Sequence, residues 1–176
     1  MSFTQGNSLP LIQLIIEKID ALGIKSTESF VQRSIEIPKP VKKPLDLAPL
    51  IEHSLLRPEA TRKDILRLCN EAKQFSFRGV CVNPVFVEEV YKQLVGTDCL
   101  AVTVVGFPLG ANLTTTKIEE TRHVIQLGAD EVDMVIPLGA LKEDDYRTVY
   151  QDIRAVVETA GSIPVKIIIE AGLLKE

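Results

Sequence analysis

From residue 47 onward, short apolar runs alternate with stretches whose apolar residues recur every three or four positions. The runs predict β-strands and the longer stretches predict helices. Expected strands cover residues 50–56, 78–83, 100–107, 131–136 and 165–170, and expected helices cover 61–75, 84–95, 114–127 and 143–160. Strands that alternate with helices are typical of a parallel α/β protein, either an open doubly wound sheet or a (β/α)₈ barrel. No GxGxxG segment follows the first strand, which weakens the dinucleotide-binding alternative.

The segment before residue 47 has a different pattern. Residues 8–22 predict a helix, with Ser8 as N-cap and Gly23 just beyond its end. Its apolar stripe is broad, so it needs a partner surface, either the main domain or another subunit. Residues 36–46 carry three prolines and three lysines and predict a stiff, solvated linker. We therefore divide the chain into residues 1–46, a helix and linker, and residues 47–176, a domain of alternating strands and helices; the resemblance described below implies that this domain is a partial (β/α)₈ barrel.

Two charged residues stand in apolar strands. Asp133 interrupts the run 132–136, and alternation places it on one strand face with Glu131 and Val135. A carboxylate there is either a structural group with hydrogen-bond partners or a catalytic acid or base. Lys166 lies near the start of the last strand, and its amine either reaches water or is desolvated with a lowered pKa. Neighbouring strands could bring the two together as a proton relay or as a buried salt bridge.

Composition and charge narrow the range of functions. The chain has 176 residues, is 45% hydrophobic and carries a net charge of −4, which gives no reason to expect nucleic acid or an anionic membrane as partner. Its three cysteines form no CxxC motif, which favours a reduced, intracellular protein. No apolar run reaches the roughly 18 residues of a membrane span, and we expect no signal peptide.

Other chemistry has weak support in the sequence. With only two histidines a metal site built on histidine is not expected; His53 should hydrogen-bond inside the core and His123 should be solvated. The loop 106–114, GFPLGANLT, leads into a helix, so its amides could bind an anion or form only a tight turn.

Five blocks in order resemble deoxyribose-phosphate aldolase: IEHSLLRPEAT (51–61), GVCVNPVFV (79–87), VTVVGFPLGAN (102–112), GADEVDMVI (128–136) and VKIIIEAGLL (165–174). The resemblance implies a (β/α)₈ barrel and a class I aldolase without metal or cofactor. Such enzymes reversibly split 2-deoxy-D-ribose 5-phosphate into acetaldehyde and D-glyceraldehyde 3-phosphate through a lysine Schiff base. The implied partners are therefore a sugar phosphate and aldehydes, the implied location is the cytoplasm, and a homo-oligomer stays open.

The resemblance also implies roles for individual residues. Asp133 matches the proton-relay aspartate, Lys166 a lysine that tunes the reactive amine, and Cys81 a cysteine near the aldehyde pocket. The family's Schiff-base lysine stands on a sixth strand, and this sequence ends earlier, so we expect a chain truncated after the fifth strand and inactive by itself. Ala171 replaces a threonine that is usual in the family. The alternative is a non-catalytic half-barrel that needs a partner, or the product of a disrupted gene.

Overall fold

The computed structural model describes residue 21 and residues 41–174. The predicted helix over residues 8–22 and the first part of the linker therefore lie outside the part we describe, apart from Ala21, which is helical. The chain divides into two compact units, Met1–Pro40 and Val41–Glu176, and the second contains the sheet. The predicted boundary between residues 46 and 47 falls within a 3₁₀ helix of this unit, η1 (Pro44–Leu50).

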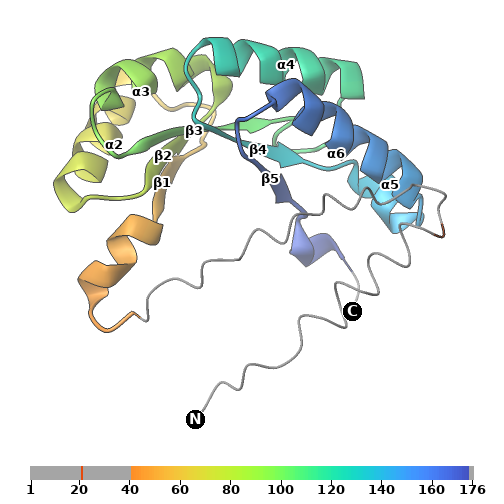
Figure 1. Cartoon of the computed structure of the whole chain (residues 1–176), viewed down its shortest axis with the longest axis horizontal. Helices are drawn as coiled ribbons and strands as arrows, with labels where there is room; N and C mark the ends of the chain where they lie inside the picture. Colours follow the sequence, from red (N-terminus) through yellow and green to blue (C-terminus); the bar gives the residue numbers. More distant parts are fainter. Residues whose placement is uncertain (1–20, 22–40, 175–176) are drawn as a thin grey trace. The chain divides into compact units, whose positions relative to one another are not determined.

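Five parallel strands form one sheet in the order of the sequence (Figure 1). They are β1 (Glu52–Leu55), β2 (Gly79–Val82), β3 (Leu100–Val105), β4 (Glu131–Val135) and β5 (Val165–Ile168). A doubly wound sheet reverses its strand order at a switch point, and no reversal occurs among the described strands. The arrangement is that of a partial (β/α)₈ barrel, which confirms the barrel alternative.

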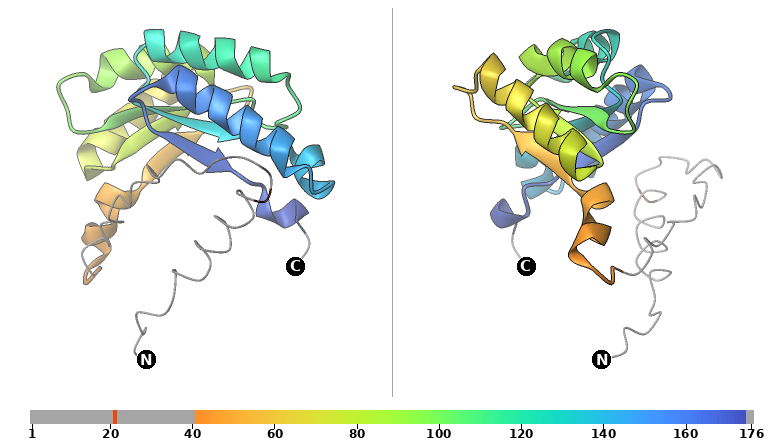
Figure 2. Two further views of the ribbon diagram at one scale, coloured as in Figure 1. Left: turned by 45° about the vertical axis from the view of Figure 1, so that its right-hand side comes forward. Right: turned by 90° about the vertical axis from the view of Figure 1, so that its left-hand side faces the viewer.

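Helices connect successive strands and lie together on one side of the sheet (Figure 2). The helices are α2 (Arg62–Phe75), α3 (Val87–Leu94), α4 (Thr114–Gln126), α5 (Leu138–Lys142) and α6 (Tyr146–Ala160), with short 3₁₀ helices at η2 (Pro84–Phe86) and η3 (Ala171–Leu173). A capping box starts α2, because Thr61 Oγ1 accepts from the Asp64 amide and the Asp64 carboxylate accepts from the Thr61 amide at 3.1 Å.

Several predicted boundaries were wrong. The helix expected over 84–95 is a 3₁₀ turn followed by α3, because Pro84 starts a 3₁₀ segment. The helix expected over 143–160 begins only at Tyr146 and is preceded by α5, which was not predicted. A positive φ of 57° at Asp144 separates the two helices, and Asp145 caps the second by accepting from the Thr148 amide. The first strand begins at Glu52 and the last ends at Ile168, each shorter than predicted.

The two faces of the sheet carry different residues because side chains alternate along each strand. The outer face packs against the helices through two apolar clusters, one centred on Val80 and Val82 and one on Val132 and Met134. We call the opposite face the inner face. It carries a smaller apolar cluster of Cys81, Val102 and Val104, and beside this cluster a group of charged side chains.

Candidate active site

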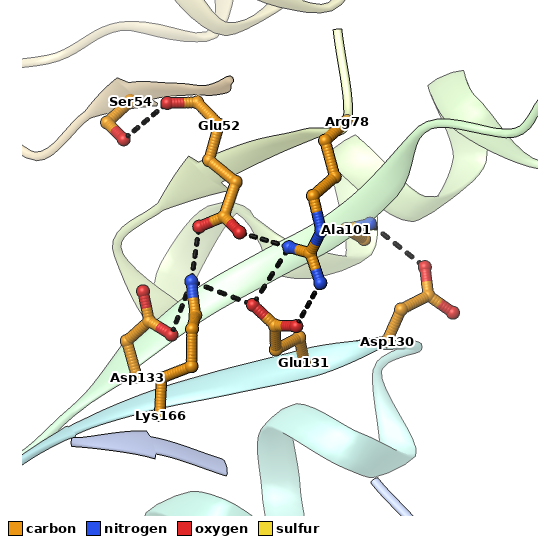
Figure 3. A network of polar contacts seen from close by, with 8 residues as sticks. All are labelled: Glu52, Ser54, Arg78, Ala101, Asp130, Glu131, Asp133 and Lys166. Carbon is orange, nitrogen blue, oxygen red and sulfur yellow. Dashed lines mark hydrogen bonds and ion pairs between the residues drawn. The ribbon is translucent and has the colours of Figure 1, made fainter. Parts of the chain in front are cut away.

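Asp133 and Lys166 lie side by side on the inner face. They are direct partners in the register of β4 and β5, and Lys166 Nζ lies 3.1 Å from Asp133 Oδ1 (Figure 3). The sequence-based prediction that the two face each other is confirmed. Asp133 Oδ1 is buried and accepts no well-aligned hydrogen bond from the described residues, so its contact with Lys166 is an ion pair only.

The surroundings of Asp133 favour its protonated form. Burial is the main cause that raises the pKa of this carboxyl above its ordinary value; Lys166 acts in the opposite direction, and the carboxylates of Glu52 and Glu131 raise the pKa further. A carboxyl that holds its proton more tightly than usual is better suited than an ordinary aspartate to donate a proton as well as accept one.

Lys166 has two further carboxylate partners. Its Nζ lies 2.7 Å from Glu131 Oε1, and it donates a hydrogen bond to Glu52. Burial lowers the pKa of this amine, but hydrogen bonds to Glu131 and Glu52 and the charge of Asp133 outweigh burial and raise it. The hypothesis of a desolvated amine with a lowered pKa was therefore wrong. An amine held as ammonium has no lone pair and cannot act as a nucleophile.

Arg78 completes a charge cluster with these groups, and the sequence analysis did not identify it. Its Nη2 donates to Glu131 Oε2 at 2.6 Å, its Nη1 donates to Glu131 Oε1 at 3.1 Å, and it also donates to Glu52. The charge cluster consists of Glu52, Arg78, Glu131, Asp133 and Lys166. Burial raises the pKa of Glu131, but hydrogen bonds from Arg78 and Lys166 hold it below its usual range.

The cluster resembles a metal site in its composition but not in its contacts. The carboxylates of Glu52, Glu131 and Asp133 offer oxygens within 4.8 Å of one another, a spacing that could hold a cation. The Lys166 ammonium lies among them and contacts all three. The three carboxylates therefore bind the Lys166 ammonium in the place where a metal ion would otherwise lie.

Cys81 lies on the same face, in the row next to Ser54 on β1. Its side chain is buried and packs with Val102 and Val104. Burial raises the pKa of this thiol to about 12, helped by the nearby charges of Asp133 and Glu52. Because the thiolate is the reactive form, the raised pKa keeps Cys81 a neutral, unreactive thiol.

The two histidines lie outside the charge cluster. His53 Nε2 lies 2.7 Å from Glu71 Oε2, with side chains that are 32% and 40% exposed. His53 therefore forms the hydrogen bond that was predicted, but the predicted position inside the core was wrong, because both side chains are partly exposed. His123 is exposed on α4, as predicted.

The loop after β3 is anchored at the carboxyl ends of the strands, where barrel enzymes place their chemistry. The Gly106 amide donates to Glu120 at 2.8 Å and the Gly110 amide donates to the Gly106 carbonyl at 2.8 Å. Both glycine amides are therefore already engaged, which favours the structural interpretation of this loop over an anion site.

A buried ion pair supports the end of β4. Lys117 on α4 is fully buried, and its Nζ donates to Asp152 Oδ2 at 2.7 Å and to the Val135 carbonyl at 2.8 Å. Thr114 Oγ1 donates to the other oxygen of Asp152 at 2.6 Å. These bonds join α4 and α6 to the strand that carries Asp133.

The chain is similar in sequence to proteins of one known family. The sequence model of the DeoC/LacD family aldolases matches residues 46–176. The chain belongs to this family. A deoxyribose-phosphate aldolase from Streptococcus pneumoniae is 54% identical over 126 residues, covering 72% of this chain and 57% of the relative. A deoxyribose-phosphate aldolase from a Geobacillus strain is 52% identical over 132 residues, covering 74% of this chain and 59% of the relative.

Solved structures of the family share the fold. The structure of a candidate deoxyribose-phosphate aldolase from Coccidioides immitis matches with a TM-score of 0.76 at 34% identity, covering 94% of this chain and 63% of that protein. A tetrameric deoxyribose phosphate aldolase from Aeropyrum pernix matches with a TM-score of 0.64 at 32% identity, covering 77% and 57%. The chain thus spans less than two thirds of the length of these aldolases. No helix among residues 41–174 is long and apolar enough to cross a membrane.

Proposed function

We propose that the polypeptide carrying this segment is a deoxyribose-phosphate aldolase, which reversibly cleaves 2-deoxy-D-ribose 5-phosphate into acetaldehyde and D-glyceraldehyde 3-phosphate. The observation that carries the proposal is the contact between Asp133 and Lys166 on the inner face of a barrel of the aldolase family. Such a reaction needs a group that moves a proton to and from a carbon next to an imine. Asp133 has the environment of that group, because its pKa is raised mainly by burial.

Lys166 has a supporting role in this proposal. Hydrogen bonds to Glu131 and Glu52 and the charge of Asp133 hold its amine as an ammonium, which has no lone pair to attack a carbonyl carbon. The amine that forms the Schiff base is therefore a different lysine. We infer from the family resemblance that this lysine stands on a sixth strand, outside residues 1–176, and that the phosphate-binding segments lie further along.

The remaining properties follow from the same assignment. We infer a substrate that is a sugar phosphate, aldehyde products, a cytoplasmic location and a mechanism without metal or cofactor. The tetrameric Aeropyrum pernix relative makes a homo-oligomer part of the proposal. Cys81 lines the aldehyde pocket as a neutral thiol in this scheme.

A trapping experiment with two polypeptides tests the proposal. One is residues 1–176, and the other is a chimera in which residues 46–176 replace the matching segment of the Streptococcus pneumoniae relative. Each is incubated with acetaldehyde and borohydride, which reduces an imine to a stable amine, and the adduct is located by mass spectrometry. We expect a two-carbon adduct in the chimera on a lysine outside residues 46–176, together with cleavage of the sugar phosphate, and neither in residues 1–176.

Two outcomes contradict the proposal. A chimera that unfolds cooperatively but neither cleaves the substrate nor forms an adduct favours a non-catalytic half-barrel. An adduct on Lys166 accompanied by aldehyde release makes Lys166 the catalytic amine and overturns the role given to it here.

A further inference from the structure

The charge cluster contains three acids and two bases, and its contacts are unevenly shared. Glu52 and Glu131 each contact both cations. Asp133 forms an ion pair with only one of the two cations of the cluster, Lys166, at 3.1 Å, and its buried Oδ1 lacks a well-aligned hydrogen bond from the described residues. With every group ionised the cluster carries one excess negative charge, and the contacts leave Asp133 as the least neutralised acid.

We propose that Arg78 is a positioning residue for Asp133: by pairing with Glu52 and Glu131, it leaves the Lys166 ammonium available to Asp133. The inference rests on the proposed function of Asp133 as the relay acid and adds a residue to that function. Arg78 does not contact Asp133 in the structure, so it acts entirely through its two acidic partners.

The shapes of the two cationic groups explain why Arg78 pairs with Glu52 and Glu131 and leaves Lys166 to pair with Asp133. A guanidinium presents a planar fork that suits a carboxylate, and Arg78 engages Glu131 with both terminal nitrogens at 2.6 and 3.1 Å. Lys166 offers three donors from one point. Without Arg78, one ammonium would have to neutralise three carboxylates, and Glu131 already lies closer to it than Asp133 does, at 2.7 Å against 3.1 Å.

The groups that face Asp133 from each neighbouring strand are few. Lys166 faces it from β5, Glu131 stands beside it on β4, and Glu52 faces it from β1. Cys81 on β2 stays uncharged because burial raises the pKa of its thiol. β3 contributes Val104, which is the register partner of Asp133. The protonation of Asp133 therefore depends on the balance between two acids and the cations that neutralise them.

Carbon-13 NMR of labelled aspartate carboxyls measures this balance in the natural polypeptide that carries residues 1–176. Asp133→Asn identifies the resonance of Asp133. Arg78→Gln removes one positive charge and should raise the titration midpoint of Asp133 by about one unit, the size expected from loss of a neighbouring charge. Glu131→Gln removes one negative charge and frees both cations, so it should lower the midpoint. Arg122→Gln, which breaks an exposed pair with Glu119 on α4, should leave it unchanged.

Conservative and compensating variants separate this role from a general loss of structure. Arg78→Lys keeps the charge and should keep the midpoint near that of the unaltered protein. The double variant Arg78→Gln with Glu131→Gln should also return it toward that value. A defect in folding would not move the midpoint in opposite directions for two single variants and restore it in their combination.

The titration midpoint of Asp133 in these variants decides whether Arg78 has the proposed role. An Asp133 midpoint that is unchanged in a folded Arg78→Gln protein, or that moves the same way in both single variants, overturns the inference. If Arg78→Gln does not fold, Glu131→Gln decides: a lower midpoint supports the inference, and an unchanged or higher midpoint overturns it. The titration needs no turnover, so an inactive protein that shows these shifts contradicts the proposed function but not the role of Arg78.

Discussion

Lys117 on α4 and Asp152 on α6 form an ion pair from which water is excluded, with side chains that are 0% and 3% exposed and a distance of 2.7 Å. Two charges at such a site are stable only because each has further partners, the Val135 carbonyl for the amine and the Thr114 hydroxyl for the carboxylate. The pair thereby couples two outer helices to the carboxyl end of β4.

Replacing one member of this pair should strongly destabilise the fold. Lys117→Met leaves the Asp152 carboxylate buried without its cation, and we expect a loss of about 3–5 kcal/mol in the free energy of unfolding. Denaturant unfolding of the natural polypeptide measures it. The matched control is Lys92→Met, which removes an exposed pair with Glu88 and should cost less than about 1 kcal/mol. A double variant of Lys117→Met with Asp152→Leu should be less destabilised than Lys117→Met alone, and equal or greater destabilisation would contradict this account.

Gly110 should tolerate no side chain. It has a φ of +65°, and a Cβ at this position would lie 2.1 Å from the Ile136 carbonyl oxygen. Gly96 is the control, because its φ is +82° but a Cβ there would meet nothing within 4 Å. Gly96→Ala should cost roughly 1–2 kcal/mol from backbone strain, and Gly110→Ala about 1–3 kcal/mol more from the clash. Equal melting temperatures for the two variants would show that the loop moves away from β4 without cost.

Acid should weaken the contribution of Glu131 to stability. Its pKa is lower in the folded state than the ordinary 4.5, so its stabilising effect is present above that value and is lost as the pH falls through the folded pKa. The difference in unfolding free energy between the unaltered protein and Glu131→Gln should therefore shrink as the pH is lowered from about 6 to about 3. Asp133 has the opposite sign: its pKa is raised mainly by burial, so its contribution declines as the pH rises above the ordinary 3.8. A constant difference across this range would contradict the assigned pairing of Glu131.

Asp133→Asn should reduce turnover far more than stability in the proposed aldolase. The amide keeps the shape of the carboxyl but cannot exchange its proton, and we expect a loss of roughly 10²-fold or more. Steady-state cleavage by the chimera, measured beside its melting temperature, provides the test. Unchanged turnover would leave Asp133 with a structural role only.

A polypeptide limited to residues 1–176 should associate or stay partly unfolded. Within residues 41–174, β1 and β5 each pair on one side only, so each presents a row of free backbone groups. Sedimentation of this polypeptide, together with thermal unfolding, measures the outcome. A monomer in solution with one cooperative transition would show that the edges are covered in another way.

The pattern of apolar and polar residues was sufficient to predict the strands of the sheet, because each strand is a short apolar run with recognisable ends. Asp133 and Lys166 could be paired in advance, since consecutive strands of a parallel repeat are neighbours. The contacts of Arg78 and Glu52 with β4 could not be predicted from the sequence, because they depend on how the sheet bends and on the register between its strands. Glu52 shares a row with Gly79 and Leu100, whereas Glu131 shares one with Val102. Alternation did place Glu131 beside Asp133, which was the available signal.

The pair formed by Lys117 and Asp152 was hidden for a different reason. Both residues lie on helices whose polar positions normally face water, and nothing in the spacing of α4 marks one lysine as buried. Its partner lies 35 positions away, on α6. Only the packing of the two helices over the end of β4 reveals that Lys117 belongs to the interior.

The shared contacts of the charge cluster also matter for anyone who redesigns this barrel. Arg78 and Lys166 each form ion pairs with more than one carboxylate. Replacing any one residue of the charge cluster therefore changes how far the charges of the other four are neutralised. Libraries that vary these positions one at a time would sample mostly unbalanced interiors. Varying them as a charge-matched group is the more productive search, and the same coupling predicts that natural substitutions at these positions arise together.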